Sequence, residues 1–244
     1  YRGVWTKERL FERSLQLEDF KSILQENPQV KDLEKDGLVV NYEALAQHYG
    51  IATNMMDMTN SPLVAAFFAT TRYDASTDTY SPILNYVSMG IIYFSPWGDM
   101  LNTSEKNRIW PIGQEALKRP GEQRAFAMVM DKDSNFDMMA FRFWHSRDAS
   151  LKIWKLTNGG TMLFPYDPMV EKILAMKKKR IYSLQSLEKV YGSNPGFADS
   201  LQHAKQIMEK EGCTFVDYLP FAYTEAEVTY LNEEYRRMYP GSFS

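Results

Sequence analysis

The sequence predicts an α+β fold, in which helices pack against a mixed sheet. Three observations lead to this class: helical periodicity at both ends of the chain, short runs of branched and aromatic residues in the middle, and no internal repeat. With 244 residues, of which 44% are hydrophobic, the chain is long enough to build its own core. We therefore expect a single domain over 1–244 whose last part, from about 165 to 244, is a helical extension.

The N-terminal part predicts a short strand and two helices. Residues 1–4 have the character of a strand, and 8–25 repeat apolar residues with a helical period. A polar stretch over 27–37, which begins with Asn-Pro, breaks the pattern and predicts no element. A second, short helix over 42–49 ends at Gly50, the residue type that most often follows a helix.

A buried helix is predicted after an extended segment over 51–59. Ser61 and Pro62 are typical of a helix start, with Ser61 as the N-cap and Pro62 as the first helical residue. Apolar residues recur among small alanines through Phe68, so we expect this helix to lie close against a sheet. The amides at its N-terminus form a natural site for a phosphate or another anion.

The rest of the chain predicts further strands and then helices. Runs of aromatic, branched and apolar residues predict strands over 90–94, 124–130 and 151–156, with a loop rich in Gly and Pro at 111–121. Amphipathic patterns predict helices over 168–191, 197–211 and 224–238.

Composition excludes several classes of protein. The chain holds 28 Lys and Arg against 31 Asp and Glu, so it lacks the basic excess that extended nucleic-acid binding needs. Cys213, the single cysteine, cannot form an internal disulfide and favours a cytoplasmic setting. No apolar run is long enough for a membrane span, so we expect no membrane partner. Because the sequence begins at Tyr1, an upstream segment or fused domain stays open.

Common catalytic motifs are absent from the sequence. The three histidines are far apart and there is no Cys-x-x-Cys, so we expect no metal site. The G-x-S-x-G, P-loop and G-x-G-x-x-G motifs are missing too. We interpret Cys213 as a buried thiol rather than a nucleophile, and the basic run 177–180 as a solvated helix end. Glu225 and Glu227 resemble paired catalytic carboxylates, but Thr224 and Glu227 fit a capping box better.

Two stretches do not fit routine core patterns. The first is Tyr1-Arg2-Gly3, and the second begins at Gln47-His48-Tyr49-Gly50 and continues through Asp57 to Ser61-Pro62. They resemble the FRG domain family, whose pattern matches 26 consecutive positions from Ala44 to Ala69, with Thr53 and Asp57 in register. A later family element, Gln-x-Gly-x-Phe, is similar to residues 123–126, with Ala125 in place of the glycine. The resemblance covers an FRG-like core over about 1–130.

The order of elements is also similar to that of the ADP-ribosyltransferases of the bacterial toxin type, which use NAD. This resemblance implies that Arg2, with Gly3 beside it, grips the diphosphate, and that Thr59 and Ser61 frame the nicotinamide pocket. Glu122 or Gln123 would hold the catalytic position that contacts the ribose, on a strand after the 111–121 loop. Cleavage of the nicotinamide–ribose bond builds positive charge, which a carboxylate stabilises and an amide does not.

Neighbouring side chains complete the implied site. Tyr49 would stack on nicotinamide, His48 would contact a ribose hydroxyl or act as a base, and Asp57 would join the cofactor-binding residues. Structural alternatives stay open: Arg2 pairs with Asp57 as a bridge, His48 and Tyr49 pack in a core, and Thr59 and Ser61 only cap a helix.

The resulting hypothesis is an NAD-binding ADP-ribosyltransferase-like enzyme or NAD glycohydrolase. NAD would be its substrate, and a protein or a nucleic acid would accept the ADP-ribose. The protein would act as an intracellular bacterial toxin or phage-defence effector. The alternative is a non-catalytic module that binds a nucleotide or a protein. A third interpretation, a nuclease, needs Asp57, Glu122 and Asp131 to converge on a magnesium ion. The oligomeric state stays open.

Overall fold

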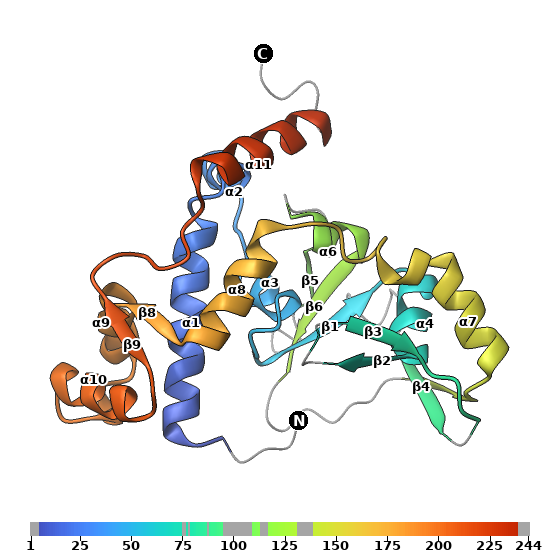
Figure 1. Ribbon diagram of the computed structural model, residues 1–244, viewed down its shortest axis with the longest axis horizontal. Coiled ribbons are helices and arrows are strands. Elements are labelled where there is room, and N and C mark those ends of the chain that lie inside the picture. The colour runs from blue at the N-terminus through green and yellow to red at the C-terminus, as the bar shows by residue number, and fades with distance from the viewer. Residues whose placement is uncertain are drawn as a thin grey trace. The chain divides into compact units, whose positions relative to one another are not determined.

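The computed structural model describes residues 5–74, 77, 79–86, 88–94, 109–112, 117–130 and 139–238 (Figure 1). These residues form two compact units. The terminal unit combines 5–53 with 167–238, and the central unit is Asn54–Tyr166. The division at 166/167 lies next to the predicted start of the helical extension near 165, whereas the division at 53/54 has no counterpart in the sequence patterns. The single domain over 1–244 stays a prediction.

The N-terminal helices of the terminal unit are α1 (Lys7–Leu24), α2 (Pro28–Lys35) and α3 (Tyr42–His48). The apolar repeat predicted for α1 supplies five buried apolar residues: Phe11, Leu15, Phe20, Ile23 and Leu24. The absence of an element over 27–37 was a wrong prediction. The Asn-Pro pair starts α2, because the side chain of Asn27 accepts from the amide of Gln29 at 2.9 Å and proline fits a first turn.

The C-terminal part of this unit continues through six elements: α8 (Pro168–Lys179), β8 (Ile181–Ser183), α9 (Leu184–Ser193), α10 (Leu201–Lys210), β9 (Thr214–Val216) and α11 (Glu225–Met238). Figure 1 shows α9 beside α1, and the two helices are in contact. A short 3-10 turn, η3 (Pro195–Phe197), joins α9 to α10. Strands β8 and β9 pair in parallel.

The single helix predicted over 168–191 is wrong. Arg180 ends α8 in the left-handed region, at φ 52°, and β8 follows before α9 begins. The guanidinium of Arg180 donates to both oxygens of Glu12, each at 2.7 Å, and this bidentate pair holds the turn. The helical period of the sequence spans the break because a three-residue strand is too short to show its own period.

The described strands of the central unit form three small antiparallel sheets and confirm the α+β class, although the predicted mixed sheet is divided. One sheet has the order β1 (Met55–Thr59), β6 (Ala125–Val129), β5 (Ile109–Pro111). The other two pair β2 (Thr71–Asp74) with β3 (Thr79–Pro82), and β4 (Met89–Phe94) with β7 (Met139–Trp144). The helices described in this unit are α4 (Pro62–Thr70), α6 (Lys118–Glu122), α7 (Arg147–Leu156) and the 3-10 turn η2 (Asn158–Gly160).

The strand predicted over 151–156 is also wrong, because these residues lie in α7. Ser146 caps this helix by accepting from the amide of Ala149 at 3.5 Å. The helix packs against α4, and Trp154 stacks on Phe67 with ring centroids 5.9 Å apart. The aromatic, branched and apolar residues of Leu-Lys-Ile-Trp-Lys-Leu fit a strand locally, but the N-cap and the core contact favour a helix.

The buried helix predicted after Ser61 is confirmed as α4. Ser61 is its N-cap and accepts from the amide of Val64 at 3.4 Å. Val64, Phe67 and Leu163 form a core cluster, against which pack four partly buried residues: Tyr80, Ile153, Trp154 and Phe164. Gly160 adopts φ +90°, and a Cβ there would lie 2.8 Å from the Phe67 ring, so only glycine fits this close approach.

Candidate functional site

The residues singled out by the sequence are distributed over both units. His48 and Tyr49 lie in the terminal unit, whereas Asp57, Thr59, Ser61, Glu122 and Gln123 lie in the central unit. Arg2, Gly3 and Asp131 lie outside the described residues. The diphosphate ligand and the nuclease triad therefore stay predictions, and each unit's candidate residues are considered within that unit.

The Gln47–Gly50 turn is held by contacts with three other residues, Thr53, Lys177 and Phe20. The side-chain oxygen of Gln47 accepts from the amide and the hydroxyl of Thr53, at 3.0 and 2.7 Å. The ammonium of Lys177 donates to the carbonyl of Gly50. The Tyr49 ring packs against Phe20, with centroids 5.8 Å apart. The basic run 177–180 is therefore not a purely solvated face, since Lys177 holds this turn and Arg180 binds Glu12.

Tyr49 belongs to the core of the terminal unit. Its side chain is 5% exposed, and its hydroxyl donates to the Asp167 carboxylate. Asp167 also caps α8 by accepting from the amide of Met169 at 2.9 Å. This geometry fits the packing alternative for Tyr49 and leaves its ring little surface for a nicotinamide. Asp167 itself was missed, although an Asp directly before Pro168 is a typical N-cap signal.

We expect Tyr49→Phe to lower the free energy of unfolding by about 1–2 kcal/mol, because the buried carboxylate of Asp167 would lose a donor. The ring contact with Phe20 survives in this variant. Urea unfolding measures the loss, and a titration with NAD measures any change in affinity. A large loss of NAD affinity together with unchanged stability would instead assign Tyr49 to the ligand site.

Thr59, Ser61 and Gln123 come together in the central unit, where β1 ends and α4 begins; we call this the β1–α4 junction. The Thr59 hydroxyl donates to the carbonyl of Gln123 at 2.8 Å and accepts from the amide of Ser61 at 3.0 Å. In the β1–β6 ladder, Thr59 lies opposite Ala125. One hydroxyl thus ties the start of α4 to the turn before β6.

Glu122 and Gln123 were predicted to lie on a strand, and that placement is wrong. Glu122 is the exposed last residue of α6, and Gln123 is its C-cap. Arg124 follows in the left-handed region, at φ 46°, and separates the helix from β6. Gln123 is 5% exposed, and its amide group donates to the carbonyl of Leu163 at 3.0 Å. Gln123 therefore serves the fold, while the carboxylate one residue earlier faces solvent.

Asp57 lies two residues before Thr59 on β1 and is exposed. Side chains two apart on a strand share a face, so Asp57 and Thr59 point to the same side of the sheet. In the ladder, Asp57 lies opposite Ala127, whose partner on β5 is Trp110. The Asp57 carboxylate therefore lies on the same face of the sheet as the Thr59 hydroxyl of the β1–α4 junction, two residues earlier on β1.

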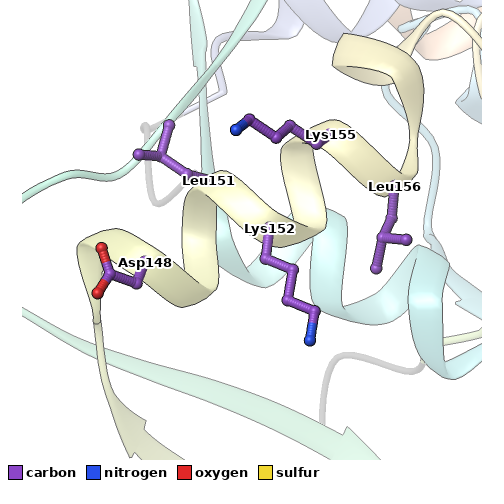
Figure 2. A pocket seen from close by; sticks show the side chains of 5 residues that line it. All are labelled: Asp148, Leu151, Lys152, Lys155 and Leu156. Atoms are coloured by element: carbon purple, nitrogen blue, oxygen red, sulfur yellow. The ribbon is translucent and has the colours of Figure 1, made fainter.

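Two surface hollows lie away from these residues. Figure 2 shows the side chains around a hollow of about 410 Å³, all of them projecting from α7: Asp148, Leu151, Lys152, Lys155 and Leu156. A second hollow, of about 260 Å³, lies between α1 and η3 and is lined by Lys7, Leu10, Phe11, Ser14, Asn194, Gly196 and Phe197. Neither is lined by a residue that the sequence singled out for a nucleotide.

Two further groups that the sequence assigned structural roles are Cys213 and the pair Thr224 and Glu227. Cys213 is buried, as predicted, and burial raises the pKa of its thiol to about 12. The capping box is confirmed: the amide of Thr224 donates to Glu227 at 2.7 Å, and the amide of Glu227 donates to the Thr224 hydroxyl at 3.3 Å. Lys172 also pairs with Glu227, at 2.7 Å.

The described residues contain neither a cluster of metal-ligating side chains nor a membrane-spanning helix. No group of three His, Cys, Asp or Glu residues in this part of the chain lies close enough to hold a metal ion. No helix described here is long and apolar enough to cross a membrane. The expectation that the protein needs no metal stays a prediction.

Comparison with known families matches residues 3–78 to the model of the FRG domain. The matched segment runs from before α1 to the β2–β3 connection, so it includes the Gln47–Gly50 turn and the β1–α4 junction. No curated protein and no solved structure matches the chain.

Proposed function

We propose that this chain, which contains an FRG domain at residues 3–78, binds NAD and cleaves its nicotinamide–ribose bond in the manner of an ADP-ribosyltransferase. The observation that carries the proposal is the β1–α4 junction. There the start of α4, the hydroxyl of Thr59 and the turn that presents Glu122 are fixed together.

The first turn of α4 suits a phosphate group. Backbone amides at a helix N-terminus carry partial positive charge and attract anions. The amides of Ser61 and Val64 are already bonded to side-chain oxygens, and Pro62 has no N–H. A diphosphate oxygen would therefore meet the amide of Leu63. Arg2 stays the proposed guanidinium ligand of the diphosphate, as the family resemblance implies.

We assign the carboxylate of the site to Glu122. Gln123 is held by the Leu163 carbonyl, and an amide cannot balance the charge that develops on the ribose. Glu122 is exposed, lies next to Gln123 in the sequence and supplies a carboxyl group. In this assignment Asp57 takes no part in the bond-breaking step and binds a ribose hydroxyl. The acceptor would be a protein or a nucleic acid, and the role that of a toxin or phage-defence effector.

A second candidate function is a non-catalytic module that binds a nucleotide. The observation in its favour is that two positions carried over as ligand contacts, Tyr49 and Gln123, are buried and bonded within the fold. A nucleotide would then bind at the β1–α4 junction without losing its nicotinamide.

The test is a titration of the full chain with NAD, read as a thermal shift and as released nicotinamide. A ligand that binds only the folded state raises the melting temperature by mass action. We expect a shift that Arg2→Ala abolishes. We also expect Glu122→Gln to lower nicotinamide release by about 100-fold, the order found when one charge-stabilising group is removed.

Glu211→Gln is the matched control, because Glu211 is also exposed at the end of a helix. Its nicotinamide release should equal that of the unaltered chain. A shift without nicotinamide release in any preparation, including one supplied with cell extract, would favour the binding module. No shift at about 1 mM NAD, the upper end of ordinary enzyme constants, would overturn both nucleotide functions.

A further inference from the structure

The surface hollow between α1 and η3, which we call the α1–η3 hollow, has the size of a site for a small molecule. Its volume is about 260 Å³. A cavity of about 150 Å³ lined by apolar side chains already holds a benzene molecule, and drug-sized ligands occupy about 300–1,000 Å³. The α1–η3 hollow therefore suits one ring with a short side group, a ligand smaller than NAD.

Two elements supply the apolar lining of the hollow. The ring of Phe11 on α1 stacks on the partly exposed ring of Phe197 on η3, with centroids 4.0 Å apart. Leu10, next to Phe11, is 44% exposed. Gly196 lines the hollow from the η3 side, and a Cβ built there would meet no atom within 4 Å. A flat ring placed in this open space would cover Leu10 and Phe197 and remove apolar surface from water.

The polar lining residues indicate the charge of the ligand. The Ser14 hydroxyl donates to the carbonyl of Leu10 at 3.2 Å, and the side-chain amide of Asn194 donates to the carbonyl of Val190 at 3.0 Å. Lys7 is exposed, and its ammonium forms no ion pair within the part of the chain that the structure describes. The ammonium is thus the donor that the fold leaves for a ligand, and it favours an anion.

The number of charges distinguishes between kinds of anion. Lys7 is the one charged side chain among the described residues that line the hollow. A carboxylate carries one negative charge, which one ammonium balances, whereas a phosphate monoester carries about 1.5 to 2 at neutral pH. A ring without a charge would leave the ammonium unused, and an anion without a ring would leave the apolar lining in water. A carboxylate attached to an aromatic ring uses both features.

We propose that the α1–η3 hollow binds a small aryl carboxylate, whose ring covers Phe197 and Leu10 and whose carboxylate pairs with the Lys7 ammonium. This binding is independent of the proposed NAD function, because both walls of the hollow belong to the terminal unit and the β1–α4 junction belongs to the central unit. The η3 wall, at 194–197, also lies outside the segment that matches the FRG domain.

Isothermal titration calorimetry of the full chain with phenylacetate tests the proposal. We expect a dissociation constant of about 1 mM or lower, within reach of a ligand of about ten non-hydrogen atoms. Benzyl alcohol, which keeps the ring without the charge, and acetate, which keeps the charge without the ring, should each bind at least about threefold more weakly. Salt should weaken the binding of phenylacetate and not that of benzyl alcohol, since salt screens an exposed ion pair.

Substitutions that fill the hollow provide the structural test. Gly196→Leu places a side chain in the open space and should abolish phenylacetate binding, as should Ser14→Leu from the opposite wall. Gly192→Leu is the matched control, because Gly192 is also exposed, a Cβ there also meets no atom within 4 Å, and Gly192 does not line the hollow. Circular dichroism and the melting temperature without ligand check that each variant folds, and the two filling variants test the site from separate walls.

The charge is tested by Lys7→Gln, which should lower the affinity for phenylacetate about threefold, as for other exposed ion pairs, and leave that for benzyl alcohol unchanged. Lys210→Gln is the control, since Lys210 is exposed and lies outside the hollow. Nicotinamide release from NAD should be the same in all these variants, so a failure of the NAD function leaves this test intact. The proposal is overturned if phenylacetate does not bind at about 10 mM, if the folded filling variants bind it as tightly as Gly192→Leu does, or if Lys7→Gln and Lys210→Gln bind it equally.

Discussion

Asp19→Ala is expected to lower the free energy of unfolding by about 3 kcal/mol, among the largest effects of any single substitution in the terminal unit. Asp19 is fully buried on α1 and accepts three hydrogen bonds from the β8–α9 segment. Alanine removes the acceptor and leaves one amide and two hydroxyls buried without it. An unpaired buried donor costs more than the hydrogen bond itself contributes.

The three donors explain why this carboxylate organises its surroundings. The amide of Ser183 donates at 3.1 Å, and the hydroxyls of Ser183 and Ser186 each donate at 2.7 Å. Ser183 is also the N-cap of α9 and accepts from the amide of Ser186 at 3.0 Å. Asp19 therefore orients the cap of a helix that is far away in the sequence and packs against α1.

Asp19 also predicts a pH dependence. Burial raises the pKa of Asp19, and the hydrogen bonds from Ser183 and Ser186 oppose that rise only in part. Because the folded-state pKa lies above the unfolded one, the folded state binds the proton more tightly. Proton binding by Asp19 therefore stabilises the folded state. This stabilisation is fully present below the unfolded-state pKa and is lost as pH rises through the folded-state pKa.

Asp19→Asn serves as the reference for this dependence, since asparagine keeps an acceptor for the two hydroxyls and does not titrate. In urea unfolding, the free energy of unfolding of the native chain should exceed that of Asp19→Asn by more near pH 4 than near pH 7. Glu18→Ala, at a partly exposed position whose ion pair with Lys189 is 3.9 Å long, should change stability by less than about 0.5 kcal/mol. Equal losses for Asp19→Ala and Glu18→Ala would contradict the assigned role.

The elements with strong local signals could be predicted from the sequence. The N-cap Ser61 with Pro62 located the start of α4, and Gly50, at φ +75°, marked the end of α3. The errors arose where local patterns were ambiguous. The segment 151–156 has the aromatic, branched and apolar residues of a strand, yet its cap at Ser146 and the contact of Trp154 with Phe67 favour a helix.

The candidate site was predictable in its residues but not in their partners. The order of residues brought Thr59, Ser61 and Gln123 to attention, and they do meet at the β1–α4 junction. The placement of Gln123 on a helix cap could not be foreseen, because it depends on the carbonyl of Leu163, 40 positions later in the chain. Every residue carries a backbone carbonyl, so the sequence does not show which carbonyl will accept the hydrogen bond.

Phe67→Ala is expected to lower the free energy of unfolding of the central unit by about 3–5 kcal/mol. The Phe67 ring is fully buried in α4 and lies among four aromatic rings, Phe68, Tyr80, Trp154 and Phe164, with centroid distances from 5.5 to 6.2 Å. Truncation to alanine would remove these contacts and leave a cavity. Because Gly160 approaches the same ring closely, the backbone of η2 would lose its support as well.

Hydrogen exchange read by mass spectrometry can locate this loss within the chain. We expect faster exchange in α4, α7 and β3, which contribute to the Phe67 cluster, and unchanged exchange in α1 and α9 of the terminal unit. Phe68→Ala is the matched control, since its ring is 40% exposed and its truncation should cost about 1 kcal/mol. Phe67→Leu, which keeps most of the apolar volume, should fall between the two. If Phe67→Ala and Phe68→Ala cost the same, the core of the central unit is not centred on Phe67, and the junction that α4 forms with β1 must be held by other contacts.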